Sequence, residues 1–275
     1  MTSLLDKIIA RKRVEVAKAK SQVKLKVLKE RAAGMDRPRN FFAAVVNSRG
    51  PRRTRVIAEI KRQSPSAGVI REDFDHVRIA KQYHQGGAAA ISCLTDEEGF
   101  GGHLGYLQQI RDAVPLPVLR KDFIVDQYQV WESRVAGADA ILLIAEVLEE
   151  GQILDMMILA RELGMTTLVE AHEVDRLLKV RHYIGFPHAG YSLLGINNRN
   201  LKSMKTDLSH IFRLLEFVEN RQVVVCESGI STRADLARLR QRGVNIALIG
   251  ERLLRQPDPG RALDELLGRP GKSKT

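Results

Sequence analysis

Acidic and basic side chains occupy the ends of several short apolar runs in this sequence. In the run VIAEIK, Glu59 and Lys61 lie two positions apart, so their side chains share one face of a strand. A charged pair beneath a layer of helices would be costly, so we expect that face to open into a pocket. Acids, bases and cations gathered in one pocket shift one another's pKa values, which suits acid–base catalysis.

Four further runs end in the same way. Any one of these ends is explained equally well by a buried salt bridge or by a solvated charge. Together they favour a catalytic pocket, because barrel enzymes draw their reactive groups from the ends of several strands. The residues concerned are Lys121, Glu170, Asn197, Arg199 and Glu227.

A second group of residues is suited to binding a phosphate. Ser228 and Gly229 follow the seventh apolar run, Gly250 follows the eighth, and each position precedes a predicted helix. In barrels the loops after these two strands commonly bind phosphate through backbone N–H groups and a helix N-terminus. Glycine permits close approach of the backbone, although an ordinary strand-to-helix turn also favours Gly and Ser.

Other kinds of site are not indicated. The seven histidines show no HxH or HxxxH spacing, so we expect no metal site. His103 and His172 fall near strand ends, where a solvated or hydrogen-bonded histidine is the simpler interpretation. Cys226 directly precedes Glu227 and so faces the opposite side of its strand, which makes it a poor nucleophile.

The elements that must position these residues repeat along the chain. Eight apolar runs start 23 to 32 residues apart, a spacing that fits a strand, a helix and two loops. Eight such units, with neither GxGxxG nor GxxxxGK[ST], predict an α/β fold, a (β/α)8 TIM barrel forming a single domain over residues 1–275. The predicted strands are VIAEIK (56–61), AAAISCLT (88–95), PVLRKDF (117–123), AILLIAE (140–146), TTLVEAH (166–172), SLLGINN (192–198), VVVCESG (223–229) and IALIG (246–250).

An N-terminal helical extension, residues 1–54, precedes the predicted barrel. Residues 3–32 show apolar positions at helical spacing, and Gly34 is a suitable stop. A short apolar helix, FFAAVVN, follows. Residues 180–191 form a longer connection than the others, which we interpret as an insertion on the side of the barrel away from the site.

Charge is distributed unevenly along the chain. Residues 1–55 hold 16 Lys and Arg against four Asp and Glu, and the rest is near neutral. Such an arm can attract nucleic acid or acidic lipid, but its apolar stripe and few aromatic residues favour a solvated helix face. No apolar run approaches the roughly 20 residues of a membrane span, and no secretory signal is evident. Cys93 and Cys226 lie in apolar runs and are expected to be buried free thiols, which favours the reducing cytoplasm.

The chain resembles the indole-3-glycerol-phosphate synthase family of tryptophan biosynthesis. KRxSPSxG and LRKDFI are the most specific of the matching motifs, and the basic N-terminal extension is similar as well. The resemblance covers nearly the whole chain. Its stretches are AEIKRQSPSAGVI (58–70), FDHVRIAKQY (74–83), ISCLTDEEGFGGHL (91–104), PVLRKDFIVDQYQV (117–130), AGADAILLI (136–144), LVEAH (168–172), LGINNRNL (194–201), ESGIST (227–232) and IGERLL (249–254).

This resemblance implies a lyase that closes a ring on 1-(2-carboxyphenylamino)-1-deoxyribulose 5-phosphate with loss of CO2 and water, without metal or organic cofactor. Lys121 would be the general acid, a role that a pocket lysine can fill if its neighbours lower its pKa. Lys61 would pair with the substrate carboxylate, and Glu170 would be a base. Glu59 would be a second acid–base group, with Asn197 and Glu227 orienting the substrate.

The resemblance also implies residues that bind the substrate without reacting. Ser64 and Pro65 would begin a flexible loop over the pocket. The apolar slot for the aromatic ring would be formed by Phe100, Phe123, Leu142 and Leu201. The phosphate would be bound by Arg199, Ser228, Gly229, Gly250 and Glu251.

The sequence departs from the family pattern at two positions of interest. Arg252 stands where a small Ser is common, and there it either strengthens phosphate binding or points to solvent. Cys226 replaces a commoner Ala. Another phosphate-binding barrel of the same pathway is the main alternative, but an isomerase of that group would need a strand-end Cys facing the pocket. A protein that binds nucleic acid through the basic arm is the second alternative, although no docking motif supports it. We expect no nucleic-acid or membrane partner, and a monomer or weak homodimer.

Overall fold

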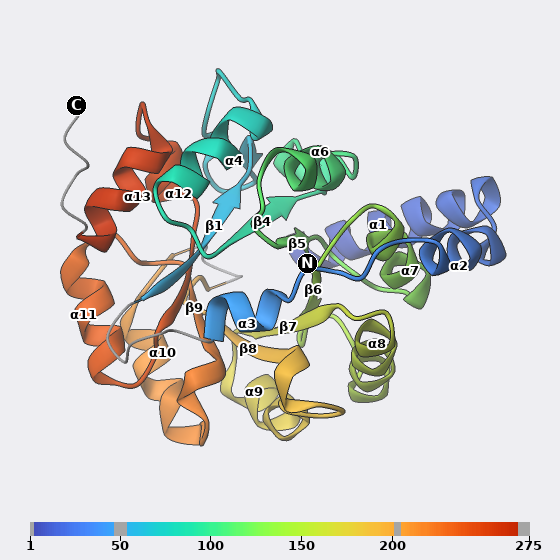
Figure 1. Cartoon of the computed structure of the whole chain (residues 1–275). Helices are drawn as coiled ribbons and strands as arrows, with labels where there is room; N and C mark the ends of the chain where they lie inside the picture. Colours follow the sequence, from blue (N-terminus) through green and yellow to red (C-terminus); the bar gives the residue numbers. More distant parts are fainter. Residues whose placement is uncertain (1–2, 47–53, 201–204, 269–275) are drawn as a thin grey trace.

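Parallel strands close into an eight-stranded barrel in this computed structural model, which describes residues 3–46, 54–200 and 205–268 (Figure 1). The strands follow one another around the barrel in chain order, and the first pairs with the last. The (β/α)8 prediction and all eight predicted strands are confirmed. The strands are β1 (Arg55–Ile60), β4 (Ala90–Leu94), β5 (Val118–Lys121), β6 (Ala140–Ile144), β7 (Thr166–Ala171), β8 (Ser192–Asn197), β9 (Val224–Glu227) and β10 (Ile246–Ile249).

Alternate residues of each strand belong to two different cores. On β1, Ile57 packs inside the barrel, whereas Val56 and Ala58 pack among the outer helices. This alternation follows from the period of two along a strand, and it places Glu59 in phase with Ile57 on the inner face. The strand therefore aims its acidic residue at the end of the barrel interior rather than at the helix layer.

Amphipathic helices cover the outside of the barrel. Several begin at an aspartate or threonine whose side chain accepts a hydrogen bond from the first turn, including Asp75, Asp126, Thr232 and Asp258. The outer helices are α4 (His76–Gln85), α6 (Tyr106–Ala113), α7 (Gln127–Val135), α8 (Glu150–Glu162), α9 (Val174–Val180), α10 (Ser209–Leu214), α11 (Arg233–Gln241) and α13 (Pro259–Leu267). Short helices occur at α5 (Glu97–Phe100) and α12 (Glu251–Leu254), with 3-10 turns at Leu215–Phe217 and Arg221–Val223.

The N-terminal extension contains two helices where the sequence predicted one continuous stretch. These are α1 (Leu4–Gln22) and α2 (Leu25–Ala33), and α2 ends at Gly34 as predicted. Val23 and Lys24 are extended and break the helix. The break is supported from outside, because the Tyr128 hydroxyl on α7 hydrogen-bonds to the carbonyls of Ala19 and Val23 at 3.1 and 2.9 Å. The turn lets α2 pack against α7 (Figure 1).

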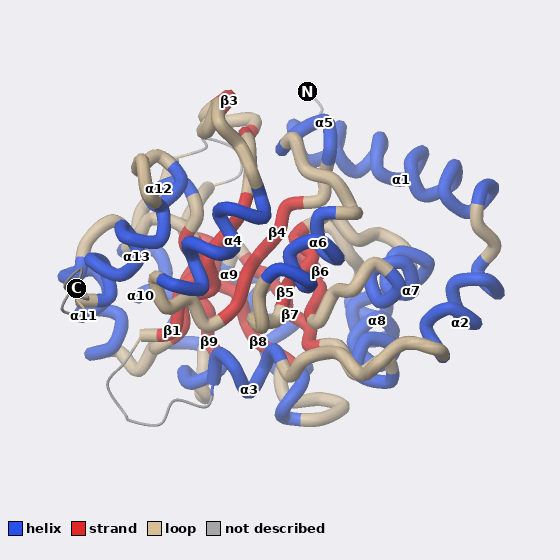
Figure 2. Tube along the Cα trace, turned by 45° about the horizontal axis from the view of Figure 1, so that its top comes forward, coloured by secondary structure: helices blue, strands red, loops and turns tan. Residues whose placement is uncertain are grey.

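The two ends of the barrel are built differently (Figure 2). At the end where the strands begin, α3 (Phe41–Val46) inserts Phe41 and Val45 into the core inside the barrel. The predicted insertion at 180–191 contains 3-10 turns at Arg181–Tyr183 and Ala189–Tyr191 and leads into the start of β8. It therefore lies at the end of the barrel away from the carboxyl ends of the strands, as predicted.

A small hairpin at the other end was not predicted. It consists of β2 (Gln63–Ser64) and β3 (Gly68–Val69), which pair in antiparallel fashion after β1. Gly68 has a φ of 63°, a left-handed conformation that favours glycine at the turn. The hairpin lies at the same end of the molecule as α5 and α12 (Figure 2).

Two predictions about the class of protein can be compared with the fold. In the part of the chain that the structure describes, no helix is long and apolar enough to cross a membrane. Cys93 and Cys226 are both buried free thiols, as expected. Burial raises the pKa of Cys93, and it raises that of Cys226 to about 12, so neither thiol is reactive.

Candidate active site

A cavity of about 620 Å³ opens at the carboxyl ends of the strands. Its wall includes every candidate residue that lies in the described parts of the chain; Leu201 lies outside the described residues. The candidate residues come from all eight strands or the loops that follow them, and they converge on one place. They are Glu59, Lys61, Ser64, Pro65, Phe100, Lys121, Phe123, Leu142, Glu170, Asn197, Arg199, Glu227, Ser228, Gly229, Gly250 and Glu251.

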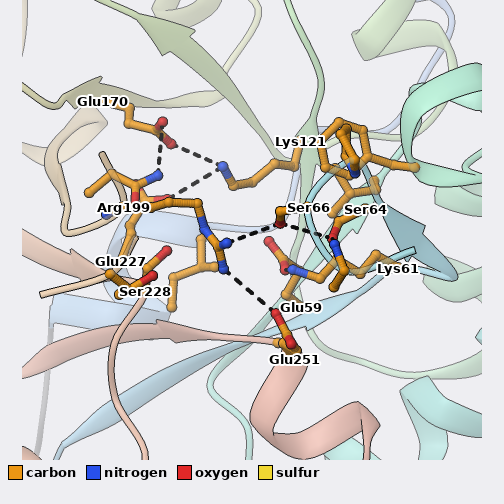
Figure 3. Close-up of a pocket in the computed structure, with 18 of the residues that line it drawn as sticks. Glu59, Lys61, Ser64, Ser66, Lys121, Glu170, Arg199, Glu227, Ser228 and Glu251 are labelled. Atoms are coloured by element: carbon orange, nitrogen blue, oxygen red, sulfur yellow. Dashed lines mark hydrogen bonds and ion pairs between the residues drawn. The ribbon is translucent and has the colours of Figure 1, made fainter. Parts of the chain in front are cut away.

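Lys121 lies among carboxylates at the centre of the cavity (Figure 3). Its Nζ is 3.0 Å from Oε2 of Glu170 and 3.4 Å from Oε2 of Glu227. Asn197 donates from Nδ2 to Oε1 of Glu170 at 3.2 Å. The three neighbouring strands β7, β8 and β9 thus supply Glu170, Asn197 and Glu227 in that order. These three side chains face Lys121 of β5. We call the set Glu59, Lys61, Lys121, Glu170, Asn197 and Glu227 the acid–base cluster.

The pKa values of the two glutamates of β7 and β9 are shifted in opposite directions. Burial raises the pKa of Glu227, and the nearby charge of Glu170 raises it further. Burial also disfavours the charged form of Glu170, but Lys121 and His172 outweigh it and lower the pKa of Glu170. Two buried carboxyl groups that lie side by side cannot both ionise at low cost, so one becomes an acid and its neighbour a base.

The neighbours of Lys121 act in the direction opposite to our expectation. Burial alone would lower the pKa of Lys121, but Glu170, Glu227 and Glu59 outweigh it and hold the pKa above its ordinary value. The sequence analysis asked for neighbours that lower the pKa of Lys121, whereas the neighbours in the structure are three acidic residues that raise it. The carboxylates around the lysine therefore favour its charged ammonium form.

Glu59 and Lys61 form a second ion pair at the end of β1. Burial raises the pKa of Glu59, whereas Lys61 and Lys121 lower it more strongly, so the carboxylate is ionised. Both side chains line the cavity together with the first residues of the hairpin, Ser64 and Pro65. The pair is thus available to a ligand on the side of the cavity opposite Glu170 (Figure 3).

Glycines on neighbouring strands make room for the buried carboxylates. A Cβ atom on Gly250 would lie 2.3 Å from Oε1 of Glu59, and one on Gly195 would lie 2.3 Å from Oε1 of Glu227. Both distances are far below van der Waals contact. The sequence predicted that Gly250 lets the backbone approach the phosphate. In the structure Gly250 also leaves space for Glu59, a member of the acid–base cluster.

The expected phosphate-binding residues form a cationic corner at the ends of β8, β9 and β10. Arg199 donates from Nη1 to the Ser66 hydroxyl at 3.0 Å and pairs with Glu251 at 3.6 Å (Figure 3). Ser228 has a φ of 65°, so the turn after β9 is left-handed at a residue other than glycine. Strain of this kind persists where the surrounding structure holds it, commonly at ligand sites. Arg252 is exposed, lines the cavity and contacts the Ser231 carbonyl at 3.4 Å.

An apolar wall faces the polar residues. The rings of Phe100 and Phe123 lie 6.2 Å apart, and Leu142 continues this wall inside the barrel. The sequence prediction missed one contributor, because the start of α1 also lines the cavity. Its residues Leu4, Leu5 and Ile8 have apolar spacing in the sequence, but no sequence signal shows which surface a helix covers.

Buried ion pairs attach α1 to the loops of the site. Nζ of Lys12 lies 2.8 Å from Asp96 and 3.0 Å from Asp122, and Arg11 lies 2.6 Å from Asp96. Asp96 caps α5, the helix that carries Phe100, and Asp122 directly follows Lys121. Some of the positive charges of the basic extension therefore form ion pairs with buried aspartates inside the protein. In the described ranges no group of three or more His, Cys, Asp or Glu residues is arranged to hold a metal ion.

Comparisons with known proteins agree on one family. A family model described as indole-3-glycerol phosphate synthase matches residues 5–266. A relative of that name from Albidiferax ferrireducens is 45% identical over 266 residues, 97% of this chain and 98% of its own. Another from Rhodopirellula baltica is 47% identical over 256 residues, 93% of this chain and 95% of its own.

Solved structures show the fold alone. The 3-hexulose-6-phosphate synthase of Salmonella typhimurium superposes with a TM-score of 0.60 and is 16% identical, covering 78% of this chain and 98% of its own. The fold is thus shared with barrels that are distant in sequence. The full-length match to the family model and the identity to the two relatives are far more specific, and they show that this chain belongs to the indole-3-glycerol phosphate synthase family.

Proposed function

We propose that the chain converts 1-(2-carboxyphenylamino)-1-deoxyribulose 5-phosphate into indole-3-glycerol phosphate, CO2 and water. One observation carries the assignment to this cavity: a charged lysine among carboxylates lies between an apolar wall and a cationic corner. The substrate has an aromatic ring at one end and a phosphate at the other, with the reacting carbons between them. Its three parts match the three parts of the cavity.

Lys121 is the general acid of the ring closure in this proposal. As the aromatic carbon attacks the ketone carbon, the ketone oxygen gains negative charge and takes a proton from Nζ. The raised pKa keeps that proton in place before the reaction, although a lower pKa would release it more readily.

The remaining steps use both sides of the cavity. Lys61 pairs with the substrate carboxylate. This carboxylate leaves as CO2 when the aromatic ring regains its electrons. Lys61 then supplies the proton that the departing hydroxyl group needs. Glu170 accepts the proton that the ring must lose as water departs. Glu59 is a second acid–base group beside Lys61, and Asn197 and Glu227 hold the substrate oxygens. The lowered pKa keeps Glu170 ionised and so able to accept a proton.

Binding of the unreactive parts follows from the same geometry. Phe100, Phe123 and Leu142 receive the aromatic ring, and Leu201 remains a sequence prediction. Arg199 binds the phosphate with its side chain. The loops after β9 and β10 bind it with backbone N–H groups, which belong to Ser228, Gly229, Gly250 and Glu251. Ser64 and Pro65 begin the hairpin that contacts this corner through Ser66. A cytoplasmic location and a monomer or weak homodimer stay predictions from the sequence.

The direct test is turnover of the proposed substrate. Purified protein is incubated with it, and the indole product is followed by fluorescence together with release of one CO2 per indole. Lys121→Met should lose at least about 100-fold in kcat, as loss of a general acid commonly does. Lys81→Met, on the exposed surface of α4, is the matched control. Absence of indole with the folded protein, or near-normal turnover by Lys121→Met, would refute the proposal or its mechanism.

A further inference from the structure

A buried histidine lies behind Glu170, and the proposed reaction does not use it. His172 is 6% exposed, follows β7 and lines the cavity. Its Nε2 is 3.3 Å from Oε1 of Glu170, and its Nδ1 is 3.1 Å from Oε2 of Glu146. The ring thus connects a carboxylate of the acid–base cluster to a second carboxylate, which comes from the loop after β6.

Backbone contacts fix this arrangement. Oε1 of Glu146 accepts hydrogen bonds from the backbone N–H groups of His172 at 2.7 Å and Glu173 at 3.2 Å. On the other side, Nε2 of His210 on α10 donates to the carbonyl of His172 at 2.6 Å. A carboxylate held by two N–H groups cannot turn away, so its remaining oxygen stays aimed at the imidazole ring.

The charges that face the ring favour its doubly protonated form. Nδ1 forms a hydrogen bond with Glu146, whereas Nε2 faces Glu170 at ion-pair distance without a hydrogen bond, so a positively charged ring has a carboxylate on each side. Burial lowers the pKa of His172, but Glu146 and Glu170 outweigh burial, and Lys121 opposes them only in part. His210 meets the carbonyl of His172 rather than its ring. The net result is a raised pKa.

Glu170 is left with one oxygen occupied and one available to the substrate. Oε1 accepts a hydrogen bond from Asn197 and faces Nε2 of His172 at 3.3 Å, whereas Oε2 accepts a hydrogen bond from Lys121. If Lys121 turns to the ketone oxygen, Oε2 becomes free and Oε1 does not. A base whose second oxygen is fixed presents its free lone pair in one direction, which is the preorganisation that proton transfer requires.

We propose that His172, supported by Glu146, is a positioning residue that fixes Oε1 of Glu170 and keeps this base ionised during turnover. The inference rests on the role of Glu170 in the proposed function. His172 acts through Glu170 and does not exchange protons with the substrate. Its removal should therefore affect kcat more than KM and should shift the acidic limb of the pH profile.

The main experiment compares kcat, KM and pH profiles of His172→Gln, Glu146→Gln and the double variant. His172→Gln should lower kcat on the order of 10-fold, as loss of supporting partners does at other sites, with KM little changed. Losing the positive charge raises the pKa of Glu170, so the acidic limb should move to higher pH. Glu146→Gln should give a smaller effect. The double variant should match His172→Gln, because Glu146 acts through His172.

Controls separate this role from a structural one. His84→Gln, on the exposed surface of α4, should leave the kinetics unchanged. A purely structural His172 would lower thermal stability without moving the pH profile, and that result would overturn the proposal. NMR titration of the unaltered enzyme gives a second readout, since the His172 ring should stay charged to higher pH than an ordinary imidazole. If the His172 ring loses its charge at the pH typical of an ordinary imidazole, the proposal is also overturned.

Glu170→Gln distinguishes the two proposals. If this variant keeps near-normal turnover, the assignment of Glu170 as base fails, and the role of His172 fails with it. If Glu170→Gln is inactive while His172→Gln has normal kcat and an unchanged pH profile, the inference about His172 alone is wrong. Loss of activity in both, with the shifted limb in His172→Gln, supports both.

Discussion

At the scale of single residues, the acid–base cluster depends on two glycines that have no side chain. Gly250 on one side and Gly195 on the other leave the space that Glu59 and Glu227 occupy. A buried carboxylate tolerates little displacement, because its ion pairs compensate for the water that it has lost. Glycine at these positions therefore sets where the charges of the cavity lie.

Gly250→Ala should displace Glu59 and reduce kcat/KM by about 100-fold, the scale expected when reacting groups shift by roughly 1 Å. Steady-state kinetics measure the loss. Gly151→Ala is a matched control, because a Cβ there on α8 meets no atom within 4 Å. Equal kinetics of the two variants would show that Glu59 does not need the space.

The candidate residues could be predicted from the sequence because strand period alone puts Glu59 in phase with Lys61 and Asn197 in phase with Arg199. What could not be predicted depends on the register between strands. Gly195 pairs with Glu170 across β8 and β7, and no pattern within one strand reveals that. The same holds for His172, whose partner Glu146 lies 26 residues earlier in the chain.

At the scale of elements, α1 belongs to the cavity and is fixed there by buried charge. Lys12 is 4% exposed and bridges Asp96 and Asp122, which themselves are almost fully buried. Burial raises the pKa of Asp122, but Arg120 and Lys12 outweigh it and lower the pKa to about 2. Asp122 therefore stays charged, and Lys12 on α1 is one of the two cations that compensate it.

Lys12→Met should lower the free energy of unfolding by about 3 kcal/mol, because it leaves buried carboxylates with fewer partners. It should also raise KM, since α5 and the start of α1 lose their mutual anchor beside Phe100. Urea unfolding and steady-state kinetics measure the two effects. Lys18→Met, exposed on the same helix, should change neither. An unchanged KM in a destabilised Lys12→Met would separate α1 from substrate binding.

The elements of the barrel could be predicted from eight spaced apolar runs, and their order followed from the barrel hypothesis. The break of the first helix at Val23 could not, because both halves carry apolar residues at helical spacing. Tertiary contact with Tyr128 decides that turn. The hairpin β2–β3 is too short for any alternating pattern to show.

At the scale of the whole molecule, the extension and the barrel should unfold as one unit. Trp131, the only tryptophan in the sequence, lies on α7, and Nζ of Lys29 on α2 is 5.3 Å from its ring centre. Its fluorescence therefore reports whether α2 is docked. We expect the urea transitions followed by tryptophan fluorescence and by circular dichroism to coincide. A separate, earlier fluorescence transition would show that residues 1–54 form an independent unit.

The basic extension also explains part of the uneven charge. Arg11, Lys12 and Lys20 pair with acidic residues of the barrel loops, including Asp96 and Asp126. Lys12 is buried and serves the fold, whereas Lys20 remains exposed in its pair with Asp126. One face of α1 is solvated, as the sequence analysis preferred, and the opposite face buries the apolar residues Ile8 and Val16 together with the charged Lys12.

Both natural thiols lie deep in the layer between strands and helices, with pKa values far above neutrality. A cysteine introduced on the surface would consequently be the one fast-reacting thiol in a labelling experiment at pH 7. Dyes or spin labels attached to the hairpin and to α1 could then report opening and closing of the cavity in solution, without first removing any native cysteine.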